Sequence, residues 1–270
     1  MPSKALKTLL SIDTLDTTLQ ASLYHNGVIY QRVAQSKKHA NHITSLVSAL
    51  CDESAIDPSS ISHLAVNSGP GPFTGLRVGI AYVRALAHAR SLPVVALTHS
   101  AILAYACVRF TAHPASPGPI IATLIDARLG QAYYASYRQH ATGLMTPLSE
   151  DRIVDLASFP AVESTSNMIK TGPFWGTYQH VPEPWRDVPA QSSPVDHPCP
   201  NTISLPFSAF LTHHAMTRAT AMIFITELLL QRQALVTLHA KDLRPNYVRH
   251  DVAKKSADQV KRDQRNDHEK

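Results

Sequence analysis

Cysteine is scarce in this sequence, and the three that are present predict neither a disulfide framework nor a metal centre. Cys51, Cys107 and Cys199 cannot all pair with one another, and no two of them have the Cys-x-x-Cys spacing of a zinc site. Cys51 and Cys107 lie in apolar stretches, so we expect them to be reduced, buried side chains of a cytoplasmic protein.

Long apolar runs are absent as well. The longest candidate, Ala219 to Leu230, is shorter than the ~20 residues of a membrane span and contains Glu227. The chain also lacks an apolar signal segment before Asp13, a Gly-x-Ser-x-Gly nucleophile turn and a Gly-x-x-x-x-Gly-Lys phosphate loop. We therefore expect no membrane span, no secretion signal and none of these hydrolase or nucleotidase signatures.

Basic residues are in excess mainly at the C-terminal end. The formal charge is +5; residues 241–270 hold nine Lys/Arg and six Asp/Glu, a net +3, which leaves +2 for the first 240 residues. With 44% hydrophobic and 17% charged residues, the composition is that of a globular protein. The body is not predicted to bind nucleic acid by charge alone, and the tail is expected to be a solvated end. Direct nucleic-acid binding is an alternative that this tail alone supports.

Periodicity along the first part of the chain predicts an alternation of strands and helices. Asn26-Gly27 separates two alternating runs, which is the strongest short-range signal for a β-hairpin. The predicted elements are a strand at 6–13, the hairpin strands at 19–24 and 28–33, a helix at 38–53, a strand at 61–67, a helix at 76–90, a strand at 94–97 and a helix at 99–110. This order is typical of a ribonuclease-H-like half-domain, with a mixed sheet flanked by helices.

A second copy of the pattern begins after the Pro/Gly stretch at 113–119. The apolar strand that ends in Ile12-Asp13 has a counterpart that ends in Ile125-Asp126, followed by a turn at 127–130 and a returning strand at 131–138. Such a duplication predicts two similar lobes facing each other. A strand, an acid and a turn are common enough, however, for chance to be the alternative.

The predicted organisation is two lobes and a tail. We expect an N-terminal lobe over 1–112 and a C-terminal lobe over 113–240, with 241–254 packing back on the first lobe. The stretch 179–206 is rich in Pro, Ser, Asp and His and lacks periodicity, so it is expected to be a long loop or partly disordered insertion. A helix is predicted over 207–235, and the polar segment 255–270 is expected to be disordered.

The sharpest local motif is the Gly/Pro loop at 69–75, which joins a predicted strand to a predicted helix. Thr74 is expected to cap that helix, and the glycines allow a tight turn. The start of a helix attracts anions through its N–H groups and its dipole, so the loop is a candidate anion site. A strand-to-helix turn without a ligand is the alternative, and on mechanism alone it is the favoured one.

Together with three other segments, this loop resembles the TsaB (YeaZ) family. The pattern Gly-Pro-Gly-x-Phe-Thr-Gly-Leu-Arg matches residues 69–77, and Ile-Asp-Thr matches residues 12–14. Ile-Asp-Ala-Arg-x-Gly at 125–130, followed by two tyrosines, and Pro-Asn-Tyr-Val-Arg at 245–249 match in family order. The resemblance implies an α/β fold like that of actin, Hsp70 and sugar kinases, with two ribonuclease-H-like lobes and mixed sheets around a cleft.

The resemblance also implies where a ligand would lie. In nucleotide-binding relatives of this fold, the strand–Asp–turn elements hold phosphates and metal. The corresponding candidate cofactor-binding residues here are Asp13, Thr14, Gly69, Gly71, Thr74 and Asp126. No cofactor of the chain's own is expected, and a nucleotide in the cleft stays open as an alternative.

One comparison within the resemblance argues against catalysis. The catalytic relative TsaD carries a His-x-x-x-His pair at a fixed distance after the shared loop, and residues four apart on a helix can grip one metal ion. Counted from Pro93 without gaps, His99 takes the place of the first histidine and Leu103 that of the second. Leucine cannot ligate a metal, so we expect no catalytic residue and no metal site. His39 and His42 could share a metal near a helix start, but solvated histidines are the favoured interpretation.

The helix after the loop has two apolar faces, of which only one is needed for its own core. Arg77, Arg84 and His88 form a narrow stripe, and nearly every other position is apolar or small. A helix enclosed within its own domain is one alternative, and a helix that binds a partner is the other, which the resemblance favours. The predicted interface residues are Ile43, Leu46, Val47, Leu50, Arg77, Ile80, Val83, Arg84, Ala85 and Ala87.

The resemblance finally implies a cytoplasmic scaffold subunit without chemistry of its own and without a membrane partner. Such a subunit pairs with TsaD, and with itself when TsaD is absent, while the small ATPase TsaE completes the assembly. The assembly transfers threonylcarbamoyl to the tRNA adenosine beside the anticodon, and tRNA is expected to be reached only through it. The main alternative is an enzyme of the same fold, either a phosphotransferase or a metallopeptidase.

Overall fold

The computed structural model describes residues 6–15, 18–35, 39–108, 117–155, 168–172, 202–206 and 216–248. The predicted tail 255–270 and residues 179–201 of the predicted insertion lie outside the described residues. Within the described ranges, no helix combines the length and the apolar character that crossing a bilayer requires.

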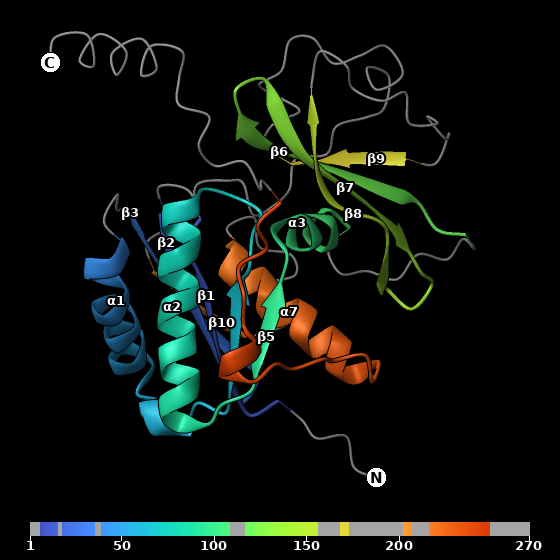
Figure 1. The fold of residues 1–270 in the computed structure, drawn as a ribbon. Coiled ribbons are helices and arrows are strands. Elements are labelled where there is room, and N and C mark those ends of the chain that lie inside the picture. Colours follow the sequence, from blue (N-terminus) through green and yellow to red (C-terminus); the bar gives the residue numbers. More distant parts are fainter. Residues whose placement is uncertain are drawn as a thin grey trace, which may run out of the picture.

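A six-stranded mixed sheet forms the core of the first half of the protein (Figure 1). Its strands lie in the order β10-β3-β2-β1-β4-β5. They are β1 Thr8–Asp13, β2 Thr18–His25, β3 Val28–Gln35, β4 His63–Asn67, β5 Val94–Leu97 and β10 Thr202–Pro206. β2 pairs antiparallel with both β1 and β3, whereas β4 runs parallel to β1 and to β5. The turn between β2 and β3 has φ of 48° at Asn26 and 85° at Gly27, the positive values that the predicted Asn-Gly hairpin requires.

A four-stranded sheet in the order β8-β7-β6-β9 repeats this arrangement in the second half. Its strands are β6 Ile120–Arg128, β7 Gln131–Gln139, β8 Met145–Asp155 and β9 Met168–Thr171. β6, β7 and β8 are antiparallel and β9 is parallel to β6, just as β1, β2 and β3 are antiparallel and β4 is parallel to β1. The internal duplication and the predicted α/β class with two mixed sheets are confirmed.

Helices cover both faces of the first sheet (Figure 1). They are α1 His39–Ser54, α2 Phe73–Arg90, α3 His99–Cys107 and α7 Arg218–Gln231, with short 3-10 turns at η1 Pro58–Ser60 and η4 Ala240–Asp242. Successive strand residues point to opposite faces, so Leu10 packs with α1 and α2 whereas Leu9 packs with α7. α3 contacts both α7 and the second sheet, and it therefore joins the two halves.

Two segments of the predicted C-terminal lobe belong to the first half instead. β10 falls in the stretch predicted to be an irregular insertion, yet it pairs antiparallel with β3 over its whole length. α7 packs on β1 and β2, where the Ser11 hydroxyl donates to the Ala219 carbonyl at 2.6 Å. The predicted boundary of 113–240 is therefore wrong for β10 and α7. The chain returns to the first sheet because the β3 edge and the second face of that sheet both need a cover.

Candidate functional site

The chain that follows β1 lies directly on the first two turns of α2. The Thr14 hydroxyl donates a hydrogen bond to the Gly75 carbonyl at 2.7 Å. A Cβ atom at Gly75 would lie 2.2 Å from the Thr14 carbonyl oxygen, and one at Gly79 would lie 2.4 Å from Thr14 Oγ1. These two glycines are thus required for close packing of β1 on α2, and Thr14 is used in that packing.

The Gly/Pro loop also uses its polar groups internally. The Gly69 N–H donates to Asn67 Oδ1 at 3.1 Å, and the Gly69 carbonyl accepts from the His99 N–H at 2.7 Å. The Gly69–Pro70 peptide bond is cis, and Gly71 lies against the Leu15 side chain. The loop therefore connects β4, the start of α3 and the segment after β1.

The start of α2 differs from the prediction. The helix begins at Phe73 after Pro72, and no side chain caps it. Thr74 lies exposed in the first turn. The expectation that Thr74 caps the helix is wrong, because Phe73 and Thr74 are already helical residues.

Asp13, at the end of β1, is the centre of a buried polar cluster. Its side chain is 0% exposed and that of Arg218 is 7% exposed. Arg218, the first residue of α7, donates to Asp13 from Nε at 3.0 Å and from Nη2 at 3.3 Å. Asn67 Nδ2 donates at 2.7 Å and the Leu15 N–H at 2.9 Å. Both carboxylate oxygens of Asp13 therefore have two donors each, all from this chain.

The electrostatics of this cluster favour a permanently charged Asp13. Burial by itself raises the pKa of Asp13, but the charge and hydrogen bonds of Arg218, with smaller contributions from His99 and Asn67, outweigh it and lower the pKa below its ordinary value of 3.8. A metal ion at Asp13 would have to displace the guanidinium of Arg218. The pattern of motifs did not indicate Arg218; its only sequence signal is one cation at the start of an apolar helix.

The two positions that correspond to the TsaD histidines are both buried. His99 is 3% exposed, and its Nδ1 lies 3.3 Å from the Pro70 carbonyl oxygen. Leu103, one turn later, is 0% exposed and belongs to the apolar cluster that joins α3 to α7. Within the described ranges, no group of three His, Cys, Asp or Glu side chains could hold a metal ion. 

Asp126, at the end of β6, repeats the local geometry of Asp13 but not its surroundings. Asp126 Oδ1 accepts from the Arg128 N–H at 2.7 Å, as Asp13 Oδ1 accepts from the Leu15 N–H. The Asp126 side chain is 40% exposed, however, and its other contact is an ion pair of 3.4 Å with exposed Arg128. Asp126 is thus engaged within its own hairpin, and the duplicated acids have different partners.

A polar junction connects the second sheet to the C-terminal segment and to α3. Asn246 donates from its backbone N–H to the Ser68 carbonyl at 2.7 Å and from Nδ2 to Asp151 Oδ2 at 2.8 Å. The Ser100 hydroxyl lies beside Asp151 and contacts Tyr137 Oη at 2.8 Å. Burial raises the pKa of Asp151 to about 6, although hydrogen bonds from Ser100 and Asn246 act to lower it. Asn246 is thus part of the contact between the halves.

The predicted interface residues divide into a buried and an exposed group. Most of them lie in the core of the first half, packed between the sheet and helices α1 and α2: Ile43, Val47, Leu50, Ile80, Val83 and Ala87. Five of the six form the inner apolar faces of α1 and α2, so the interface assignment is wrong for them. Val47, which is 7% exposed, also borders the hollow between these two helices. Leu46 is half-buried, and Arg77, Arg84 and Ala85 are exposed.

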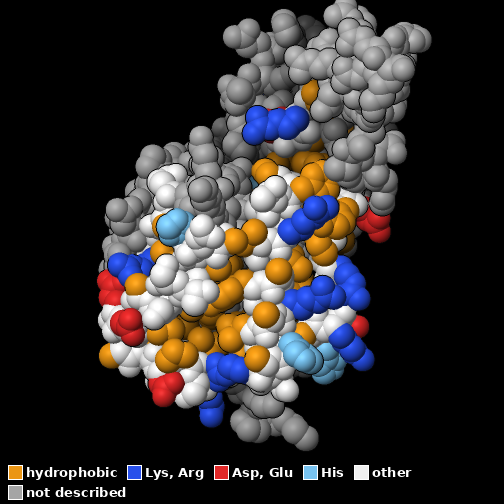
Figure 2. Space-filling model, turned by 60° about the vertical axis from the view of Figure 1, so that its left-hand side comes forward, with side chains coloured by type: hydrophobic (Ala, Val, Ile, Leu, Met, Phe, Trp, Pro, Cys, Tyr) orange, Lys and Arg blue, Asp and Glu red, His pale blue; other side chains and the backbone are white. Residues whose placement is uncertain are grey.

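The outer surface of α1 and α2 carries an apolar groove. Figure 2 brings these helices to the front and shows hydrophobic side chains gathered on this face. A hollow of about 340 Å³ lies between the two helices, with Val47 and Cys51 of α1 on one side and Tyr82 and Leu86 of α2 on the other. The outer surface of α2 also carries a stripe of small exposed side chains, namely Ala81, Ala85 and Ala89. 

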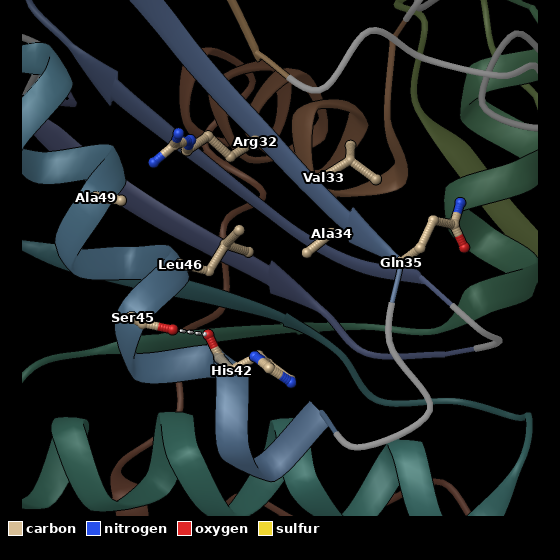
Figure 3. A pocket seen from close by; sticks show the side chains of 8 residues that line it. All are labelled: Arg32, Val33, Ala34, Gln35, His42, Ser45, Leu46 and Ala49. Atoms are coloured by element: carbon tan, nitrogen blue, oxygen red, sulfur yellow. Dashed lines mark hydrogen bonds between the residues drawn. The ribbon is translucent and has the colours of Figure 1, made fainter.

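A second hollow, of about 490 Å³, lies between β3 and α1 (Figure 3). Its lining is Arg32, Val33, Ala34 and Gln35 from β3, and His42, Ser45, Leu46 and Ala49 from α1. Arg32 Nε forms an ion pair with Glu53 Oε2 at 3.5 Å. His42 is the one histidine among the described lining residues, and the His39 side chain of the predicted pair lies outside the described part of the chain.

Comparison with known proteins gives the family context of this geometry. Residues 19–195 match the model of the family described as TsaD, tRNA N6-adenosine threonylcarbamoyltransferase. The tRNA threonylcarbamoyladenosine biosynthesis protein TsaB of Bacillus subtilis is 31% identical over 154 residues, which are 56% of this chain and 64% of that protein. TsaB of Escherichia coli is 27% identical over 137 residues, 50% of this chain and 57% of that protein. The matches thus span less than two thirds of these relatives.

Solved structures extend the similarity over most of the chain. A Pseudomonas aeruginosa protein described as similar to the peptidase YeaZ superposes with a TM-score of 0.68 at 25% identity, covering 90% of this chain and all of that one. YeaZ from Pseudomonas aeruginosa gives a TM-score of 0.67 at 24% identity, covering 89% of this chain and 99% of that one. The two lobes described above are therefore arranged as in YeaZ.

Proposed function

Because the chain belongs to the TsaD family and, within it, to the TsaB (YeaZ) group, we propose that it is a non-catalytic subunit that binds and stabilises a TsaD-type partner. In this proposal the partner transfers threonylcarbamoyl to the tRNA adenosine beside the anticodon. TsaE joins the assembly, and the chain pairs with itself when the partner is absent.

The observation that carries the proposal is the buried ion pair between Asp13 and Arg218. In the nucleotide-binding fold, the acid after the first strand is a position from which metal and phosphate are held. Here both of its oxygens are saturated by donors of the same chain, and its charge is compensated by Arg218. With Leu103 buried at the place of the second histidine, the chain lacks two elements of a metal-dependent enzyme.

The outer face of α1 and α2 supports docking of a partner. The exposed alanines of α2 permit close approach of a second helix, because methyl side chains leave the backbone accessible. The neighbouring groove of about 340 Å³ is large enough for one apolar side chain of that helix. Apolar surface that is exposed in the single chain would be buried in the complex, which is the main driving force of association.

Co-purification with TsaD from the same cell tests the proposal. The wild-type chain should elute with TsaD in a stoichiometric complex, and Ala81→Arg should abolish the complex because the long charged side chain blocks the helix face. Ala234→Arg, the same change at an exposed site beyond α7, is the matched control and should leave the complex intact. Failure of the wild-type chain to bind TsaD would contradict the proposal, and equal binding by Ala81→Arg would place the interface elsewhere.

A further inference from the structure

One edge of the α1–α2 face carries a row of basic side chains that come from two distant parts of the chain. α2 contributes Arg77, Arg84 and His88, and the segment around η4 contributes His239, Lys241 and Arg244; all six side chains are exposed. Figure 2 shows Lys, Arg and His side chains along this edge of the face. We call these six residues the basic ridge.

Contacts between the two segments hold the ridge together. Arg84 Nε donates to the Ala240 carbonyl at 3.3 Å, and Arg77 Nε donates to Tyr247 Oη at 2.9 Å. Within the C-terminal segment, Arg244 Nη1 donates to the carbonyl of the preceding residue, Leu243, at 3.0 Å. The segment therefore runs along α2 in the opposite direction, and each of these contacts uses one nitrogen of a guanidinium that has five N–H donors.

The charge of the ridge is only partly compensated, because its four Lys/Arg side chains have one carboxylate in the same two segments. α2 contains no Asp or Glu, and Asp242 is the one carboxylate between residues 239 and 247. The ion pairs found among the described residues join Arg32 to Glu53, Arg128 to Asp126 and Arg218 to Asp13, and none of them involves the ridge. Such a surface attracts a polyanion.

The two ends of the ridge add features that suit a nucleic acid. At the α2 C-terminus, a hollow of about 500 Å³ is lined by His88, His239 and Lys241 together with Leu92 and three small residues. At the other end, Phe73 and Tyr247 lie with ring centroids 5.4 Å apart, and the Arg77 guanidinium lies 5.8 Å from each centroid. The negative end of the α2 dipole lies at the first environment, so a phosphate there would have to be held by the charge of Lys241. A base can stack on the exposed part of the second environment.

We propose that the basic ridge binds the phosphate backbone of RNA, and that this chain thereby contributes directly to tRNA binding in the complex. The identification of the RNA as tRNA rests on the proposed function. From Arg77 to His88 the helix rises about 16 Å, at 1.5 Å per residue, so the ridge can reach several phosphates. A protein partner is less suited, because the ridge has no apolar centre, whereas the groove on the other side of the alanine stripe has one.

The test compares the full-length wild-type chain with Arg84→Gln/Lys241→Gln/Arg244→Gln. Filter binding with tRNA is measured over a series of KCl concentrations, for the chain alone and for its complex with TsaD. The triple variant should bind tRNA at least tenfold more weakly, and the slope of log K against log salt should fall by roughly two, since each lost phosphate contact removes about 0.7–0.9. A matched control, Lys7→Gln/Arg152→Gln/Arg232→Gln, removes the same charge from exposed sites off the ridge and should change affinity less than threefold.

Further measurements separate electrostatic binding from structural damage and from partner binding. Arg84→Lys/Arg244→Lys keeps the charge and should retain tRNA affinity, and thermal melting should show that all variants fold. Unchanged tRNA affinity and salt slope in the Gln variant would overturn the proposal, as would the absence of tRNA binding by both chain and complex at low salt. Loss of TsaD binding with retained tRNA affinity would also overturn it and assign the ridge to the protein interface. If the wild-type chain binds tRNA but not TsaD, the proposal for the basic ridge is supported and the proposed function is contradicted.

Discussion

Two acids at strand ends occupy equivalent places in the duplicated fold but have different partners. Asp13 and Asp126 occupy equivalent places in a duplicated fold and make the same local turn. Their surroundings differ because of Arg218. Arg218 supplies a buried counter-charge to Asp13, whereas Asp126 is partly exposed and pairs with Arg128. The difference between a potential ligand and a structural ion pair thus lies in one residue that is distant in sequence.

The energetic weight of that ion pair is testable. Arg218→Ala should lower the free energy of unfolding at neutral pH by about 3–5 kcal/mol, because it leaves a buried carboxylate without its counter-charge. Asp13→Asn in the same background should recover part of the loss, since the amide carries no charge. Urea denaturation of the wild-type, single-variant and double-variant proteins measures this directly.

The pH dependence of the same variant supplies a second check. Because the folded pKa of Asp13 is lowered, its contribution to stability is present above the ordinary value of 3.8 and is lost as the pH falls through the folded pKa. The deficit of Arg218→Ala should therefore shrink as Asp13 becomes protonated in acid. A deficit that stayed constant from pH 7 to pH 3 would show that lost packing of Arg218, and not charge, is responsible.

Asp151 should have the opposite effect on stability. Its pKa in the folded protein is raised to about 6, so between the ordinary value of 3.8 and that value the folded state binds more protons than the unfolded state. Stability should fall as the pH rises through this window. Asp151→Asn should remove this dependence and stabilise the protein at pH 7–8, by at most about 3 kcal/mol. Melting curves at pH 4.5 and 7.5 test this; an equal shift at both pH values would contradict the assignment.

At the scale of elements, α2 combines three surfaces on one helix. Its first two turns accept the chain after β1 at Gly75 and Gly79, its inner face packs in the core, and its outer face carries the alanine stripe beside the basic ridge. This explains the almost continuous apolar sequence of the helix. The structure also decides between its two faces, since Ile80 is 3% exposed whereas Ala85 lies outside.

A pair of glutamate substitutions distinguishes the two faces of α2. Ile80→Glu should unfold the first half or destabilise it by several kcal/mol, because it buries an unpaired charge. Ala85→Glu places the same group in solvent, so its melting temperature should stay close to wild type while self-association and TsaD binding are lost. Thermal melting, gel filtration and co-purification measure these outcomes. Unfolding of both variants would mean that the outer face is internal, and unimpaired pairing by Ala85→Glu would move the interface elsewhere.

At the scale of the whole molecule, the two copies of one sheet pattern have different surroundings. The first half has helices on both faces of its sheet, and the second half packs on α3. The return of β10 and α7 to the first half brings Arg218 to Asp13. The path of the chain thus places an internal cation, Arg218, against Asp13.

The purified chain is accordingly expected to be inactive by itself. Elemental analysis should find less than stoichiometric metal, and incubation with tRNA and the threonylcarbamoyl donor should give no modified adenosine until TsaD is added. Addition of TsaD provides the positive control in the same assay. One tightly held metal ion per chain, or tRNA modification by the chain alone, would contradict this prediction.

The sequence by itself determined the local elements and their order. Alternation, helical spacing and Asn26-Gly27 act over a few residues, so they fixed the first strands, their hairpin turn and helices α1 and α2. Leu103 was visible in the sequence as a missing ligand for the same reason: helical spacing is local. The charge of the body was known only as a sum of +2, which contains no information on where cations gather.

Only the tertiary structure decided which distant segments meet and which helix faces are buried. Arg218 lies 205 residues from Asp13, and the ridge joins Arg84 to Ala240 across 156 residues. No local pattern encodes such pairs, because they depend on the return of the chain after the second sheet. The sequence also could not tell which face of α1 and α2 is buried, because both faces are apolar. Only packing on the sheet removes one of them from solvent.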